Sequence, residues 1–221
     1  MAGEVFGRSA DPVSIDVWSD VMCPFCYMGD ALLGQALERF PHETVTRYHA
    51  FQLMPELPSD KPANVLDILE KEKGFPRAQA EAMNAQVAER GKALGLDYRF
   101  DTALAVNTRD AHRLSHFAAA HGSQTDLVHR LFKAFFTDGL NVADHDVLAD
   151  LAAETGLDRS AALSALKNGD YDDAVDADIR QARELRVTGV PFFVIDGKYG
   201  VSGAQPVEAF LQALETAWTN R

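Results

Sequence analysis

The stretch that decides the fold is Trp-Ser-Asp-Val-Met-Cys-Pro-Phe-Cys-Tyr, residues 18–27, which joins a strand pattern to a helix pattern. Before it, Val13, Ile15 and Val17 alternate with a second set of side chains, which predicts a half-buried β-strand over 13–20. After it, apolar residues recur at helical spacing and stop at Pro41, a residue that helix interiors do not tolerate. The sequence therefore predicts a strand that leads through two cysteines directly into a helix.

Composition and charge narrow the class of protein. The chain has 221 residues, of which 47% are hydrophobic, and its 21 basic and 33 acidic side chains give a net charge of −12. A chain of this length buries about 70% of its unfolded surface, so its stability requires no disulfide or metal. We expect neither nucleic acid nor a membrane as partner, because the negative charge opposes both and no apolar run approaches the ~18 residues of a membrane span.

The chain contains only two cysteines, Cys23 and Cys26. Residues 1–13 lack the apolar core of a secretory signal, so we expect a cytoplasmic location, where a lone cysteine pair is more typical of catalysis or metal binding than of a structural disulfide. A zinc site would need further cysteines or suitably spaced histidines, so we expect no metal. We interpret His112 and His116, one helical turn apart, as solvated or core residues.

The element pattern changes twice along the chain. A second β-rich run covers 44–51, helical periodicity dominates 63–186, and two short runs then flank Asp196-Gly197, a dipeptide typical of a hairpin turn. We therefore predict an α/β protein with a thioredoxin-like core, residues 13–62 and 187–221, and a large all-helical insertion, residues 63–186, between the second and third core strands. Residues 1–12 are expected to form a flexible tail.

The cysteine spacing predicts a division of roles. Cys23 falls at the start of the predicted helix and Pro24 in its first turn, so the Cys23 sulfur lies near unpaired amide donors that favour thiolate over thiol. Cys26 follows one turn later and reaches that sulfur from a deeper position. We predict an exposed attacking thiolate at Cys23 and a buried resolving thiol at Cys26. Asp16 is a candidate proton acceptor for Cys26, although a solvated aspartate is the more frequent case.

A second candidate site is the segment 188–193, in which Pro191 opens a strand after the insertion. Most X-Pro bonds are trans, but this position in the topology favours a cis bond that lies against the two sulfurs. The backbone of Val190 would then be free to pair with an extended substrate strand. We expect Pro24 and Phe25, between the cysteines, to contact the substrate as well.

Four segments together carry a resemblance to a known family. They are Trp18–Tyr27, Asn107–Arg113, Gly189–Phe193 and Val201–Pro206. In them the chain resembles the DsbA-like thioredoxin-fold oxidoreductases, in particular their FrnE-like branch. This resemblance implies a Cys23 nucleophile, a resolving Cys26, and Pro191 as a cis-proline that faces them.

The same branch also resembles glutathione-dependent relatives, the kappa-class transferases and the 2-hydroxychromene-2-carboxylate isomerases, in which a serine stands at the position of Cys23. The intact dithiol favours disulfide exchange with protein or low-molecular-weight thiols, because only exchange needs a resolving thiol. A redox-regulated binding or chaperone module is a third alternative. We expect no tightly bound cofactor, with glutathione as the candidate co-substrate, and the direction of exchange and the oligomeric state stay open.

Overall fold

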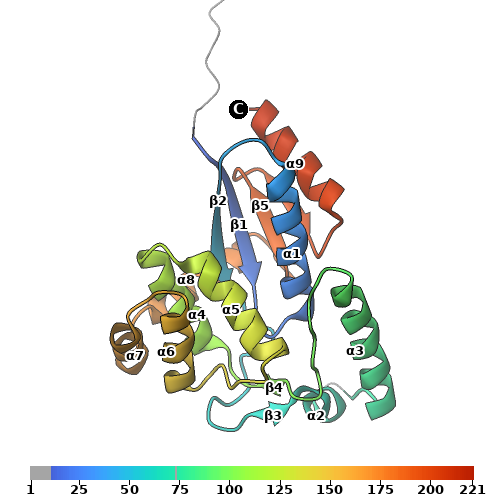
Figure 1. Ribbon diagram of the computed structural model, residues 1–221, viewed down its shortest axis with the longest axis vertical. Helices are drawn as coiled ribbons and strands as arrows, with labels where there is room; N and C mark the ends of the chain where they lie inside the picture. Colours follow the sequence, from blue (N-terminus) through green and yellow to red (C-terminus); the bar gives the residue numbers. More distant parts are fainter. Residues whose placement is uncertain (1–10, 73) are drawn as a thin grey trace, which may run out of the picture.

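The computed structural model describes residues 11–72 and 74–221, which form a four-stranded sheet, a second sheet of two short strands, and surrounding helices (Figure 1). The elements, in chain order, are β1 (Val13–Ser19), α1 (Pro24–Arg39), β2 (Thr44–Ala50), β3 (Ala63–Asn64), α2 (Val65–Lys71), α3 (Arg77–Lys92), β4 (Leu104–Ala105), α4 (Arg109–Ala120), α5 (Gln124–Phe136), α6 (His145–Glu154), α7 (Arg159–Asn168), α8 (Asp172–Glu184), β5 (Phe192–Ile195), β6 (Tyr199–Ser202) and α9 (Val207–Thr219).

The strand order of the larger sheet is β2-β1-β5-β6. β1 and β2 are parallel, and α1 provides the crossover that a parallel pair requires. β5 pairs antiparallel with both β1 and β6. The turn between β5 and β6 places Asp196 at φ 53° and Gly197 at φ 65°, the left-handed conformations that favour glycine, asparagine and aspartate in tight hairpins. The predicted hairpin is therefore confirmed.

The alternation in β1 separates two buried faces. Val13, Ile15 and Val17 are at most 2% exposed, and this face lies under α1 and α9, which pack side by side (Figure 1). On the same face Phe193 of β5 meets Phe210 of α9 edge to face, with ring centroids 4.8 Å apart. The opposite face carries Trp18, which is also buried. The second residue set is mixed in character, because Ser14 and Asp16 on that face are half-buried and polar.

The fold prediction is confirmed: the core is thioredoxin-like, and a helical insertion follows β2 in the chain and precedes β5. The insertion is not entirely helical, because β3 and β4 pair antiparallel through Ala63–Asn64 and Leu104–Ala105. Asn64 holds this small sheet in place, since its side chain accepts a hydrogen bond from Leu66 N at 2.9 Å and donates one to Asp101 O at 2.7 Å. Strands of two residues are too short to produce an alternation that sequence analysis can detect.

The division into segments 13–62, 63–186 and 187–221 stays a prediction. The predicted tail, residues 1–12, falls largely on residues 1–10, which lie outside the described part of the chain. None of the described helices has the length and apolar character that crossing a bilayer requires.

Asp178 of α8 anchors the insertion to the sheet. Its carboxylate accepts hydrogen bonds from Ala50 N at 2.8 Å and shares others with His49 Nδ1 and His116 Nε2, each at 2.8 Å, while Trp18 Nε1 donates to its carbonyl at 3.3 Å. Burial raises the pKa of Asp178, but the hydrogen bonds from the two histidines and Ala50 outweigh that effect and hold it well below its ordinary value. The carboxylate therefore stays charged.

His49 is the other half of this anchor. Its Nε2 lies 2.9 Å from Asp16 Oδ1, so the ring bridges two carboxylates. Burial lowers the pKa of His49, but the hydrogen bonds to Asp16 and Asp178 overcome that effect and raise it to about 9. The resulting ion-pair chain joins β1, β2 and α8.

Candidate active site

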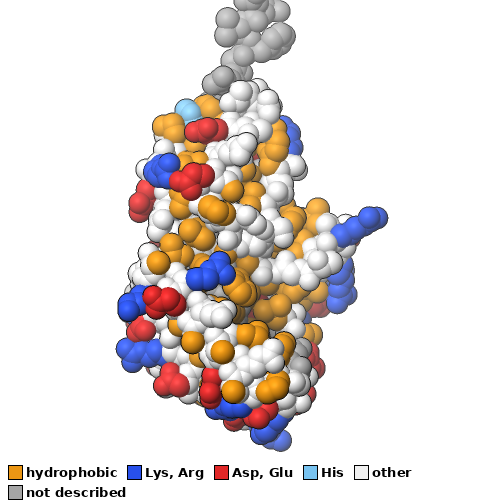
Figure 2. Space-filling view, turned by 90° about the vertical axis from the view of Figure 1, so that its right-hand side faces the viewer, with side chains coloured by type: hydrophobic (Ala, Val, Ile, Leu, Met, Phe, Trp, Pro, Cys, Tyr) orange, Lys and Arg blue, Asp and Glu red, His pale blue; other side chains and the backbone are white. Residues whose placement is uncertain are grey.

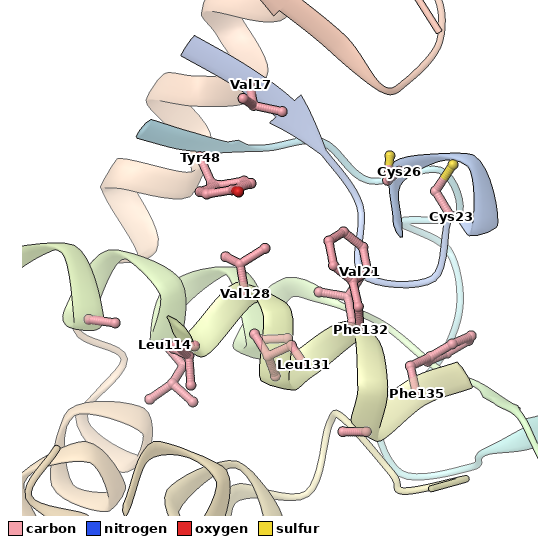
Figure 3. Packing of buried hydrophobic residues seen from close by; sticks show 14 of the residues in the cluster. Val17, Val21, Cys23, Cys26, Tyr48, Leu114, Val128, Leu131, Phe132 and Phe135 are labelled. Carbon is pink, nitrogen blue, oxygen red and sulfur yellow. The ribbon is translucent and has the colours of Figure 1, made fainter. Parts of the chain in front are cut away.

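The two cysteines lie at the start of α1, as predicted. Cys23 is the residue before the first helical position, with φ −86° and ψ 113°, and Pro24 opens the helix. The Cys23 amide donates to Asp20 O at 3.0 Å, and the Cys23 carbonyl accepts from Cys26 N at 3.0 Å. Both cysteines are free thiols, and Figure 3 shows their sulfur atoms next to each other. The two thiols therefore lie together at the first turn of α1.

The prediction that Cys23 is the exposed member of the pair is wrong. Cys23 is 3% exposed and Cys26 is 2% exposed, so exposure hardly distinguishes them. Cys23 is covered by the loop before β5, where its thiol donates to Val190 O with an Sγ–O distance of 3.5 Å. That loop lies far along the chain, and no local pattern near the cysteines indicates that it closes over Cys23.

The environment of Cys26 fixes its protonation state. Burial raises the pKa of the Cys26 thiol, and the hydrogen bond and charge of Cys23 raise it further. The Ser19 hydroxyl and the backbone of Asp20 act in the opposite direction and offset only part of this rise. Cys26 is therefore a thiol at neutral pH, and it must lose a proton before it can attack a disulfide.

The Val190-Pro191 peptide bond is cis, as predicted. Pro191 approaches α1 so closely that a Cβ on Gly29 would lie 2.9 Å from Pro191 Cγ. From the other side, Gly203 N donates to Pro191 O at 2.8 Å. The loop before β5 is thus held between α1 and the end of β6. The sequence predicts a Val190 carbonyl that is free for substrate, but it accepts the hydrogen bond from the Cys23 thiol.

Beside the cysteines lies an apolar cavity of about 340 Å³. Pro24 and Phe25 form one wall, and Phe25 is 39% exposed, with the Arg90 guanidinium 5.8 Å from its ring centroid. The opposite wall comes from α2 and α3, through Ile68, Met83 and neighbouring residues. In Figure 2, hydrophobic side chains gather between charged ones on the face to which α3 belongs. The insertion therefore supplies one wall of the cavity that Pro24 and Phe25 line.

Tyr98 is a site residue that the sequence analysis did not identify. Its hydroxyl donates to Pro24 O at 2.6 Å, which fixes the backbone between the two cysteines. Gly91 of α3 makes this contact possible, because a Cβ there would lie 2.2 Å from the Tyr98 ring. Burial raises the pKa of Tyr98, so the hydroxyl stays protonated. No motif pairs these residues, and only folding brings them together.

The buried carboxylate nearest the cysteine loop is Asp20 rather than Asp16. Asp20 is fully buried, and its carboxylate accepts hydrogen bonds from Leu53 N at 2.7 Å and Met22 N at 3.4 Å. His112 Nε2 lies 3.5 Å from Asp20 Oδ1. Asp16 is engaged by His49, 2.9 Å away. The sequence offers one signal that could have identified Asp20: this residue stands three positions before Cys23.

Most of the segment Asn107–Arg113 has a structural role. Asn107 Nδ2 donates to Pro55 O at 2.9 Å and to Leu57 O at 3.0 Å, which ties the loop after β2 to α4. Arg113 donates to Ala165 O at 2.9 Å and to Leu166 O at 2.8 Å, so it satisfies carbonyls at the end of α7. His112 is the exception, because it faces Asp20.

The two histidines on α4 serve different carboxylates. His116 pairs with Asp178 and His112 lies beside Asp20, and both histidines are largely buried. Across residues 11–72 and 74–221, no three or more His, Cys, Asp or Glu side chains come together as metal ligands would.

Comparison with known proteins identifies close relatives of this architecture. The DSBA-like thioredoxin domain family matches residues 14–215. The crystal structure of the probable DsbA oxidoreductase SCO1869 from Streptomyces coelicolor has a TM-score of 0.88 and 38% sequence identity, and the match covers 95% of this chain and 91% of that one. The uncharacterized protein YwbO from Bacillus subtilis is 29% identical over 204 residues, which are 91% of this chain and 96% of that protein.

The cytosolic disulfide reductase DsbM from Pseudomonas aeruginosa is a more distant structural neighbour. It has a TM-score of 0.67 at 18% identity, and the match covers 94% of this chain and 100% of that one. A 2-hydroxychromene-2-carboxylate isomerase follows with a TM-score of 0.65 at 18% identity, over 94% of this chain and 95% of that one. At such low identity, both show the shared fold alone.

Proposed function

The chain belongs to the DSBA-like thioredoxin domain family, and from this membership we propose that it is a thiol–disulfide oxidoreductase that acts through Cys23 and Cys26. One observation carries the proposal: two free thiols lie at the first turn of α1, where Cys23 raises the pKa of Cys26 and the Cys23 thiol donates a hydrogen bond to the Val190 carbonyl. Two cysteines with a purely structural role would not require one thiol at a helix N-terminus and the other one turn further into the helix.

In the proposed reaction the oxidised protein takes electrons from a substrate dithiol. A substrate thiolate attacks the sulfur of Cys23, the Cys23–Cys26 bond breaks, and Cys26 leaves as a thiolate that takes up a proton. A second substrate thiolate then attacks the substrate sulfur of the mixed disulfide and releases Cys23. The substrate leaves oxidised and the protein reduced. In the reverse direction Cys23 attacks a substrate disulfide, and Cys26 resolves the mixed disulfide.

The surface around the pair favours substrates with an apolar part next to the reacting sulfur. We expect Pro24 and Phe25 to contact that part in the apolar cavity, and Val190 and Pro191 to contact the backbone of an extended substrate. A volume of about 340 Å³ lies within the range of small-ligand sites, so both protein and low-molecular-weight thiols fit this surface. We place the reaction in the cytoplasm, without a tightly bound cofactor, and place the chain in the FrnE-like branch.

The redox potential of the pair should be moderate. The residues between the cysteines are Pro24 and Phe25, so no histidine stands there to stabilise a thiolate. A strongly oxidising pair, at about −120 mV, owes its potential to a stabilised reduced form. We therefore expect a more negative potential here, which titration against glutathione mixtures would measure.

Trapping tests the proposed function. Cys26→Ser should accumulate mixed disulfides at Cys23 and lose turnover of a disulfide substrate, because no resolving thiol remains. Cys23→Ser is the matched control and should form no such adduct. Full activity of Cys26→Ser with glutathione and a small electrophile would instead support the glutathione-dependent alternative and contradict the exchange reaction.

A further inference from the structure

His112 has an unusual environment for a buried side chain. It is 6% exposed, and its buried Nε2 atom has no hydrogen-bond partner among residues 11–72 and 74–221. The carboxylate oxygen Oδ1 of Asp20 lies 3.5 Å away. Buried polar atoms in folded proteins nearly always have a partner, so an orphaned one calls for an explanation in terms of a bound molecule or a function.

A small cavity lies next to His112. Its volume is about 20 Å³, which is enough for one water molecule. Its polar lining consists of Ser19, Tyr48, His49, His112, Ser115 and His116. A water in this cavity would have the polar partners that buried waters require.

The cavity connects His112 with the resolving thiol. Ser19, which lines the cavity, also acts on Cys26, because its side chain lowers the pKa of that thiol. The other groups that shift the pKa of Cys26 are the Cys23 thiol and the backbone of Asp20, and neither of them is a base. Ser19 therefore links the Cys26 thiol to the cavity beside His112.

We propose that His112, oriented by Asp20, accepts the proton of Cys26 through Ser19 and a water held in this cavity. The inference rests on the proposed function and deepens it. In the resolving step the Cys26 thiol gives its proton to the Ser19 hydroxyl, Ser19 gives its own hydroxyl proton to the water, and the water passes one to His112. The Cys26 thiolate attacks Cys23 in the mixed disulfide, and the substrate sulfur leaves as a thiolate. No further reactant is needed, because the proton on His112 returns to solvent or to the departing thiolate.

The charges around His112 suit this role. The titratable group that faces His112 directly is Asp20, from the turn before α1. The cavity is also lined by Tyr48 and His49 from β2 and by His116 from α4, while α5 contributes apolar side chains. Cys26 of α1 is linked to the cavity through Ser19. Within the described part of the chain, only Asp20 lies within ion-pair distance of Nε2, and its carboxylate would stabilise the imidazolium that the proton transfer creates. His112 acts through intervening groups, so it is a positioning residue.

A two-phase assay separates the two cysteines. The reduced protein is mixed with an aromatic disulfide whose thiol product is coloured: attack by Cys23 releases the first equivalent, and resolution by Cys26 releases the second. In His112→Gln the first phase should keep its rate, while the second should slow by at least about tenfold, since positioned proton transfer contributes about 10²–10⁴-fold. The second phase should also lose the wild-type inflection in its pH profile, which a merely structural residue would not affect.

His116→Gln is the matched control, since His116 lies one turn along α4, lines the same cavity and pairs with Asp178 instead of Asp20. Both of its phases should stay within about twofold of wild type. Equal slowing of the second phase in both variants would mean a packing effect and would overturn the inference. A second phase of wild-type rate and pH profile in His112→Gln would overturn it as well, while leaving the proposed function intact.

If His112→Gln does not unfold cooperatively, it is not a properly folded variant, and Asp20→Asn then provides the test of the inference. Asparagine retains an acceptor for Leu53 N and removes the charge, so the inflection of the second phase should move to lower pH. An unmoved inflection would contradict the inference. A wild-type protein that shows neither phase would overturn the proposed function, and the inference with it.

Discussion

Two glycines of α1 allow the free-energy cost of crowding the contact between this helix and Pro191 to be measured. A Cβ on Gly29 would lie 2.9 Å from Pro191 Cγ and 3.2 Å from Phe193 Cζ, whereas a Cβ on Gly34 would have no atom within 4 Å. Both glycines occupy interior positions of the same helix, so alanine brings both the same gain in helix propensity, about 0.8–1.0 kcal/mol. The difference between the two substitutions therefore isolates the contact.

The magnitude follows from these contacts. Pro191 cannot rotate away, because its ring is part of the backbone and its carbonyl is held by Gly203 at 2.8 Å. Overpacking of this kind costs about 1–3 kcal/mol. Gly34→Ala should thus raise the free energy of unfolding by about 1 kcal/mol, and Gly29→Ala should fall about 1–3 kcal/mol below Gly34→Ala.

Urea unfolding of the reduced proteins measures both values, with m-values compared to ensure that the unfolded states are alike. Gly29→Ala should also slow mixed-disulfide formation at Cys23, because the displaced loop carries the Val190 carbonyl that contacts its thiol. If Gly29→Ala proves as stable as Gly34→Ala and reacts at the wild-type rate, α1 does not hold Pro191 in the way described.

Three further predictions concern the thiols, the pH dependence of stability and Tyr98. Limited alkylation of the reduced protein at neutral pH should label Cys23 before Cys26, because burial raises the pKa of Cys26; peptide mapping that finds the reverse order would reject the assignment. Because the pKa of His49 is raised from 6.5 to about 9, its ion pairs should stabilise the fold fully below pH 6.5 and lose up to about 3 kcal/mol as the pH rises through 9. Urea unfolding in a background with both cysteines changed to serine should show this slope, and His49→Gln should flatten it. Tyr98→Phe should cost about 0.5–1.5 kcal/mol, the value of its hydrogen bond to Pro24, and thermal unfolding that shows no loss would count against that bond.

The core strands and the cysteine helix were predictable because local rules determine them. The alternation of Val13, Ile15 and Val17, the Asp196-Gly197 turn and Pro24 at the helix start each act within a few residues. The strands β3 and β4 were missed because they are two residues long and depend on pairing with each other. The helices of the insertion were predictable as helices, but their packing depends on contacts between distant segments.

The burial of Cys23 could not be predicted for a similar reason. Helix geometry places its sulfur at the N-terminus of α1, where an exposed position is the natural expectation. The group that covers it, Val190, lies 167 residues away in the chain. Asp16 lies close to Cys26 in the sequence, which makes it a candidate partner, whereas its side chain pairs with His49 from β2.

The insertion contributes residues to the candidate site in addition to packing on the core. Tyr98 fixes the backbone between the cysteines, and α2 and α3 form the far wall of the apolar cavity. α4 presents His112 to Asp20, and its N-terminal half is anchored twice, by Asn107 to the loop after β2 and by Arg113 to α7. Because both anchors use hydrogen bonds to backbone carbonyls, they fix the position of α4 independently of the side chains that line the cavity. The position of His112 beside Asp20 is thus set by the packing of the insertion onto the core, and a substitution that loosens Arg113 should alter the resolving step without touching either cysteine.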